Sequence, residues 1–352
     1  MKYKPDFEEA IPRLEAFWRG EFIDRPCMDI TAPKGKPFHG HVPDTIEQRW
    51  TDQNYIIENA EAKMESTYFA GEAVPIFRPN LGPDLFSALL GGTICYNSER
   101  TSWVAPFLDW NHLPSFEIDE NSFEWQWHIK LYDRLKERSP DRYFVTVPDC
   151  HSGGDALLAM RGGTDLCMDI YDHPEEIKTV MKYLEKALVR FNEAFQKKVK
   201  ETGQNGHVTS WLRTWSPVFA TPVQLDLLAL ISPAMFEEFF LNEVKLQCHV
   251  AENTIFHLDG PDAIKHLPII CELPVNAVQW VPGAGQKPMI AWLDLLKEIQ
   301  SYGKGLHLSC HKDEVEVLVS ELSSNGLYIC TSADSPEEAD ELLKTARSLA
   351  HK

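Results

Sequence analysis

A histidine and a carboxylate two residues apart stand at the end of an apolar segment in the second half of the chain. The segment reads TIFHLDGP over residues 254–261. Apolar and β-branched residues followed by a Gly-Pro pair indicate a buried strand that ends at a turn. His257 and Asp259 then project from the same face, because side chains alternate along a strand. Such a pair can bind a metal ion, move a proton or orient a substrate.

Polar side chains also stand at or just after the ends of the other apolar segments. We interpret as strands the segments 25–31, 143–147, 207–212, 254–257, 275–281, 304–308 and 326–330. The residues near their ends that could do chemistry are Asp149, Cys150, His151, Arg213, Trp215, Asp226, Trp280, His307, Cys310, His311 and Cys330. In barrels of alternating strands and helices the active site lies at the carboxyl ends of the strands. We therefore expect most of these side chains to face one site.

A metal ion and a proton-transfer pair are both compatible with this pattern. A catalytic zinc site needs three protein ligands and an open position. His257, Asp259 and Cys330 can supply the ligands if the fold brings their strands together. Without a metal, His257 and Asp259 would act as an acid/base pair in which the carboxylate orients the imidazole.

Several of these features also have a purely structural interpretation. His257 can be a hydrogen-bonded core histidine, Asp259 can stabilise its own turn, and Cys330 can be a small buried hydrophobe. The PGAG sequence at 282–285 fits a tight turn better than a phosphate-binding loop. The tryptophan-rich region 101–127 fits a packed cap, or an aromatic wall for a flat or methylated ligand.

Helices are expected between the strands that carry these residues. They are predicted over 6–19, 45–63, 120–138, 154–161, 165–171, 174–202, 233–252, 261–267, 288–301, 312–323 and 335–349, with Gly/Pro-rich loops over 33–43 and 74–96. Four consecutive strand–helix units in the second half predict parallel strands joined by right-handed crossovers. Composition does not change sharply along the chain, so we expect an α/β protein with one domain over 1–352.

Composition argues against several classes of function. The chain has 352 residues, a formal net charge of −19 and a pI near 5.1, which does not suit nucleic-acid binding because that requires a basic face. No run of about 18 apolar residues occurs, so no membrane span is expected. The N-terminus lacks an apolar signal core, and the eight cysteines are scattered without a CxxC pair. We therefore expect a cytoplasmic protein without disulfides.

Four segments resemble the uroporphyrinogen decarboxylase superfamily, and within it the corrinoid-linked methyltransferases. They are GTDL to YDHPEE over 163–176, QLD with ISP and FEEF over 224–239, FHLDG over 256–260, and ICT to SPE over 329–337. The resemblance covers about residues 140–350 and is weak over the first 140. His257 and Asp259 stand where the methyltransferases have His-x-Cys, and Cys330 stands at their last zinc cysteine. The segment RPCMDI over 25–30 lacks the Arg-rich signature of the decarboxylases.

The resemblance implies a single distorted (β/α)8 TIM barrel with N-terminal helical and loop elaborations over 1–140. It implies an enzyme that moves a methyl group between a small substrate and a corrinoid protein or a thiol, with Zn²⁺ at the barrel mouth. The metal ligands would be His257, Asp259 and Cys330. The catalytic candidates are His257, Asp226 and Arg213, and the substrate-binding candidates are Trp211, Trp215, Trp280 and His151.

Two other functions remain open from the sequence. One is a metal-free decarboxylase or lyase for a small carboxylic acid, in which Arg213 anchors the carboxylate and Asp226 or His257 handles protons. The other is a non-catalytic subunit that presents the barrel mouth to a corrinoid protein. Neither alternative involves nucleic acid or a membrane.

Overall fold

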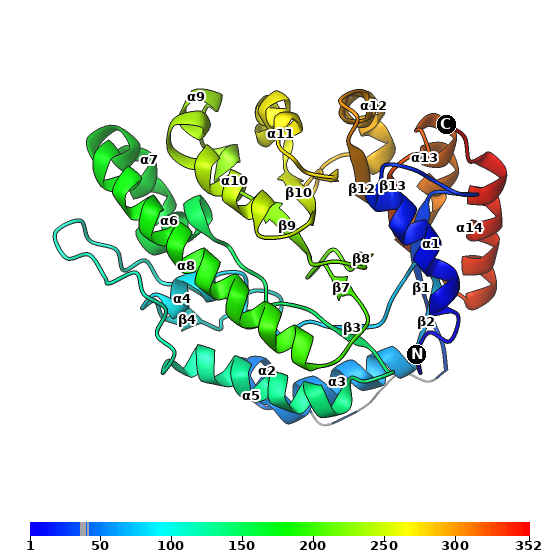
Figure 1. The fold of residues 1–352 in the computed structure, drawn as a ribbon, viewed down its shortest axis with the longest axis horizontal. Coiled ribbons are helices and arrows are strands. Elements are labelled where there is room, and N and C mark those ends of the chain that lie inside the picture. Colours follow the sequence, from blue (N-terminus) through cyan, green and yellow to red (C-terminus); the bar gives the residue numbers. More distant parts are fainter. Residues whose placement is uncertain (36–39, 41) are drawn as a thin grey trace.

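The computed structural model describes residues 1–35, 40 and 42–352 (Figure 1). The loop predicted over 33–43 therefore lies partly outside the described residues. No helix in the described part of the chain is long and apolar enough to cross a membrane.

A seven-stranded sheet forms the centre of the fold. Its order is β2(Thr67–Gly71), β1(Cys27–Pro33), β13(Leu327–Ser332), β12(Gly305–Ser309), β11(Ala277–Val281), β10(Asn253–Asp259) and β9(Ala220–Gln224). All neighbours are parallel except β2, which runs antiparallel to β1. The predicted α/β class with parallel strands in the second half is confirmed.

Shorter strand pairs stand beside this sheet. They are the parallel pair β3(Ile76–Phe77) and β6(Phe144–Val145), and the antiparallel pairs β4(Ile94–Cys95) with β5(Trp103–Val104) and β7(His207–Val208) with β8(Trp215–Ser216). Among the described residues no strand pairing joins them to the large sheet, so the predicted closed eight-stranded barrel is not seen as a continuous ladder.

The region predicted as one strand over 207–212 differs most from expectation. Only residues 207–208 are extended there, and the chain turns back as the hairpin β7–β8. The strand that joins the large sheet is β9, a segment for which no strand is predicted. Its residues ATPVQ contain a proline that weakens the strand pattern.

Helices surround the strands, as Figure 1 shows. The α-helices are α1(Phe7–Trp18), α2(Ile46–Thr51), α3(Gln53–Glu65), α4(Leu85–Leu89), α5(Phe123–Arg138), α6(Gly153–Arg161), α7(Gly163–Asp172), α8(Pro174–Glu201), α9(Pro233–Met235), α10(Leu241–His249), α11(Leu267–Glu272), α12(Leu293–Ser301), α13(Val315–Glu321) and α14(Pro336–Leu349). Shorter helical turns are η1(Asp226–Ala229), η2(Phe236–Phe240), η3(Pro261–His266), η4(Met289–Trp292) and η5(Lys312–Glu314). The predicted helix over 45–63 is broken in two because Asp52 is extended and its carboxylate caps α3.

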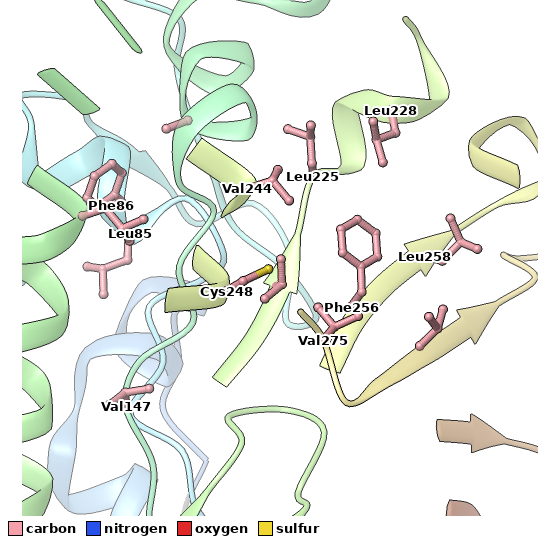
Figure 2. Close-up of a cluster of buried hydrophobic side chains, with 14 of the residues drawn as sticks. Leu85, Phe86, Val147, Leu225, Leu228, Val244, Cys248, Phe256, Leu258 and Val275 are labelled. Carbon is pink, nitrogen blue, oxygen red and sulfur yellow. The ribbon is translucent and has the colours of Figure 1, made fainter. Parts of the chain in front are cut away.

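The hydrophobic core fixes the orientation of β10. Phe256 and Leu258 are fully buried in the cluster shown in Figure 2, which also contains Leu225 and Val244. Burying side chains of this size contributes about 1.5–3 kcal/mol each. Because alternate residues of a strand face opposite sides, this packing directs His257 to the other face of the sheet.

Candidate functional site

Three side chains with metal-binding atoms converge at the ends of two neighbouring strands. Asp226 begins η1 directly after β9, and His257 and Asp259 stand on the last residues of β10. One ligand atom from each lies within 4.8 Å of the other two. Nε2 of His257 is 3.8 Å from Oδ1 of Asp226. The structure therefore brings together the predicted pair and the predicted acid/base residue Asp226.

The facing atoms of this group are acceptors. Nδ1 of His257 lies 2.6 Å from Oε1 of Gln279, and an amide oxygen only accepts, so Nδ1 carries the proton. Nε2 is the ring nitrogen that faces Asp226, and the neutral ring would offer a lone pair there. Oδ1 of Asp226 is buried and has no hydrogen-bond partner among the described residues. Carboxylate oxygens gathered beside an imidazole nitrogen make a suitable place for a cation.

Asp226 is held in position by a second carboxylate behind it. Asp155, buried on α6, accepts hydrogen bonds from the backbone N–H groups of Asp226 and Leu227, each at 2.9 Å. Burial and the nearby charge of Asp226 raise the pKa of Asp155 to about 6. These two bonds fix the start of η1 and with it the direction of the Asp226 side chain.

His151 lies on the other side of Asp226. Its Nδ1 is 3.2 Å from Oδ1 of Asp84, and its Nε2 is 3.8 Å from Oδ2 of Asp226. Burial lowers the pKa of His151, but the hydrogen bond with Asp84 and the charges of Asp155, Asp149 and Asp226 outweigh it and raise that pKa to about 9. His151 is therefore an imidazolium at neutral pH and can hold or donate a proton beside the site.

Trp211 forms an aromatic wall of the site. It belongs to the loop between β7 and β8, and its ring stands edge-on to His257 with 5.8 Å between the ring centroids. The predicted substrate-binding residues Trp211 and His151 thus both lie against the converging side chains.

Four other predicted site residues lie elsewhere. Trp215 and Trp280 are buried, the former packed edge-on to Phe7 and the latter to Trp292, so neither presents surface to a ligand. Cys330 is buried with its Sγ 3.7 Å from Nε2 of His307. Arg213 pairs with Asp29 at 3.3 Å.

Cys330 is therefore not part of the converging group. Asp226, and not the predicted Cys330, lies beside His257 and Asp259. Burial and the charge of Asp29 raise the pKa of the Cys330 thiol far above its usual range.

Three supporting residues were not identified from the sequence: Asp84, Asp155 and Gln279. Gln279 carried a usable signal, because it alternates with Trp280 on the predicted strand 275–281 and so faces the other side of the sheet. In the structure it pairs in register with His257. Asp84 and Asp155 lie in a loop and a helix far from any strand end, and nothing in their local sequence marks them.

Comparison with known proteins identifies the fold. No protein-family model matches the chain, and no curated protein sequence matches it. Among solved structures, a methyltransferase from Methanosarcina mazei superposes with a TM-score of 0.64 at 12% identity, over 96% of this chain and 97% of that one. A B12-independent methionine synthase from Shewanella sp. W3-18-1 gives a TM-score of 0.47 at 10% identity, over 92% and 96% of the two chains. The chain has the fold of the first of these proteins, and its membership of the corrinoid-linked branch stays a prediction.

Proposed function

We propose that this protein is an enzyme that transfers a methyl group between a small substrate and either a corrinoid carried by a partner protein or a thiol. The observation that carries the proposal is the convergence of Asp226, His257 and Asp259 with their acceptor atoms facing one another. The fold shared with the Methanosarcina mazei methyltransferase supports methyl transfer as the class of reaction. A corrinoid protein as partner rests on the sequence resemblance.

The donor atoms of the site fit a divalent metal, and zinc is the ion we assign. Zinc in proteins is bound by histidine nitrogen and carboxylate oxygen as well as by cysteine. Asp226, His257 and Asp259 would hold it, and two carboxylates would balance its charge. Gln279 would support the ligand, because a hydrogen bond to the second ring nitrogen fixes the tautomer and orientation of a metal-binding histidine. Zinc, when bound, acts as a Lewis acid that polarises a heteroatom.

The protein's own residues would orient the substrate and manage its proton. Trp211 stands edge-on to His257 and would bound the substrate on that side. His151, protonated at neutral pH, holds a proton on the side of Asp226 away from His257. A histidine in this position can give that proton to a leaving heteroatom.

The test is a methyl-transfer assay with zinc-loaded protein. Methylcobalamin serves as the corrinoid and homocysteine as the thiol, and the loss of the methyl–cobalt absorption band is followed over time. We expect the wild-type protein to accelerate the loss and the variants Asp226→Asn and His257→Gln to be much slower. A wild-type rate equal to that of the protein-free mixture contradicts methyl transfer. Release of carbon dioxide from carboxylic acids in the presence of chelator would instead support the decarboxylase alternative.

A further inference from the structure

A recess lies beside β1, and its lining does not include Asp226, His257 or Asp259. It has a volume of about 280 Å³. Its lining residues are Thr31, Ala60, Lys63, Met64, Thr67, Phe69, Val74, Ile76 and Arg213. Most of the wall is apolar, and the charged side chains on it, Lys63 and Arg213, are both cationic. An apolar recess with a few converging polar groups is the usual form of a small-molecule site.

Arg213 is held toward this recess by an uncommon backbone conformation. Its φ is +59°, in the left-handed region that residues with a Cβ seldom adopt. The conformation is fixed within the β7–β8 hairpin, where the Arg213 N–H donates to the carbonyl of Thr209 at 2.8 Å. Strained residues of this kind concentrate at ligand-binding sites, because the surrounding structure must maintain them.

The guanidinium of Arg213 has spare hydrogen-bonding capacity. Within the described residues its one carboxylate partner is Asp29, at 3.3 Å, and 37% of the side chain is exposed. A guanidinium offers five N–H donors in a fork that matches a carboxylate. Asp29 is itself buried, and neither of its oxygens has a hydrogen-bond partner among the described residues. Arg213 therefore has N–H donors left for a ligand in the recess.

We infer that this recess binds the carboxylate end of a small organic acid. Arg213 anchors the carboxylate, and the aliphatic part of the acid lies against Met64, Phe69 and Ile76. Both charged residues of the lining, Lys63 and Arg213, are cationic, and the planar guanidinium fork of Arg213 matches a carboxylate.

The recess and the candidate metal site share a structural element. Trp211, which covers His257, and Arg213, which lines the recess, are two residues apart in the β7–β8 loop. An acid bound at Arg213 is thus linked to His257 through one short loop. The identity of this acid as the methyl-transfer substrate rests on the proposed function, whereas carboxylate binding in the recess does not.

Binding of three probes tests the inference: hexanoate, its neutral counterpart hexanamide, and butyl phosphate. Affinities are measured by titration calorimetry on the full-length protein. We expect hexanoate to bind wild type at least about tenfold more tightly than hexanamide or butyl phosphate. Equal affinity for hexanoate and hexanamide would overturn the inference, and tighter binding of butyl phosphate would overturn the assignment to a carboxylate.

Two variants locate the binding. The double variant Arg213→Gln with Asp29→Asn removes the anchor without leaving Asp29 as an unpaired buried charge, and we expect it to bind hexanoate and hexanamide equally. Ala60→Phe fills the recess from α3 and leaves Arg213 in place, so hexanoate binding should be lost while the thermal unfolding midpoint stays near that of wild type. Undiminished hexanoate binding by a folded Ala60→Phe variant would overturn the inference.

Zinc content separates this inference from the proposed function. We expect Ala60→Phe to lose hexanoate binding and to keep the zinc content of wild type. Loss of zinc together with hexanoate binding in this variant would contradict two separate sites. Hexanoate binding by a wild-type protein that takes up no zinc would support the recess and overturn only the metal.

Discussion

Two groups of buried or half-buried residues in this molecule surround their carboxylates in opposite ways. Around Glu72, which is 0% exposed, every carboxylate oxygen has a donor. Arg25 donates to both oxygens at 2.5 and 3.0 Å, and the Met28 N–H donates at 2.8 Å. At the ends of β9 and β10, by contrast, Asp226, His257 and Asp259 turn acceptors toward one another.

This difference indicates that the Glu72 group contributes to stability and that the group at the ends of β9 and β10 contributes to function. A buried charge that is fully hydrogen-bonded within the protein has no capacity left for a ligand. Removing one of its partners lowers the free energy of unfolding. A group of acceptors without donors is unfavourable in the protein alone, and a cation can make it favourable. Variants in the two groups should therefore change different measured quantities.

The largest effect is expected from breaking the Glu72 group. Arg25→Ala leaves Glu72 buried without its main partner, and we expect the free energy of unfolding to fall by about 3–5 kcal/mol. Urea titration measures it. Arg19→Ala is the matched control, since Arg19 pairs with Glu21 at 3.0 Å on the surface and should change stability little. A loss no greater than that of the control would show that the Glu72 group is not structural.

A smaller effect is expected at the support of the candidate metal site. Gln279→Leu removes the acceptor for Nδ1 of His257, and the affinity for zinc should fall by about 10–100-fold. Gln279→Glu keeps an acceptor there and should bind zinc more tightly than the leucine variant. Competition with a chromophoric chelator measures both. Equal affinities for wild type and Gln279→Leu would mean that His257 does not bind the metal through Nε2.

Glu243 lies between these two cases, because its carboxyl group is buried and hydrogen-bonded but its partners are neutral. Ser152 and Gln247 donate to its carboxylate at 2.7 and 3.0 Å. Burial raises the pKa of Glu243 to about 8, so the folded protein keeps a proton that the unfolded chain releases above its ordinary pKa of 4.5.

The pH dependence of stability follows from this pKa shift. Between about pH 4.5 and 8 the folded state binds the extra proton, so the free energy of unfolding should decrease as pH rises, by up to about 1.4 kcal/mol per pH unit. Above pH 8 this contribution levels off. Glu243→Gln should flatten the slope in urea titrations between pH 5 and 8. The same slope in wild type and variant would contradict a protonated Glu243.

The smallest effect is expected at Cys330. Because its buried thiol lies by His307 and outside the converging carboxylates, Cys330→Ala should leave the zinc content unchanged. Elemental analysis after zinc loading measures it. A Cys330→Ala protein that lost its zinc would restore this cysteine as a ligand and remove Asp226 from that role.

Strand periodicity explains which parts of the site could be predicted. His257 and Asp259 follow a clear apolar strand, and their spacing of two gives them one face. The same rule applied to β11 would have chosen Gln279, in register with His257, over its neighbour Trp280, whose indole packs on Trp292. The residue type favours Trp280 as an aromatic wall of the site, but the alternation of side chains along a strand decides which face of the sheet a residue occupies.

Other parts of the fold and site depend on long-range contacts. The hairpin β7–β8 and strand β9 lie in a segment rich in aromatic and polar residues, where no simple period appears. Asp155 supports Asp226 across 71 residues of sequence. Cys330 is predicted as a ligand from its place at a strand end and from the family resemblance, and its burial beside Arg213 and Asp29 depends on the packing of strands distant in the chain.

The metal content of the purified protein tests the central claim most directly. After loading with zinc and removal of the excess by gel filtration, we expect wild type to retain about one zinc per chain, as a single site with an open position requires. Asp226→Asn and Asp259→Asn should retain almost none while unfolding at midpoints near that of the metal-free wild type. Wild type without zinc above background, or an Asp226→Asn protein with the same content as wild type, would contradict the account.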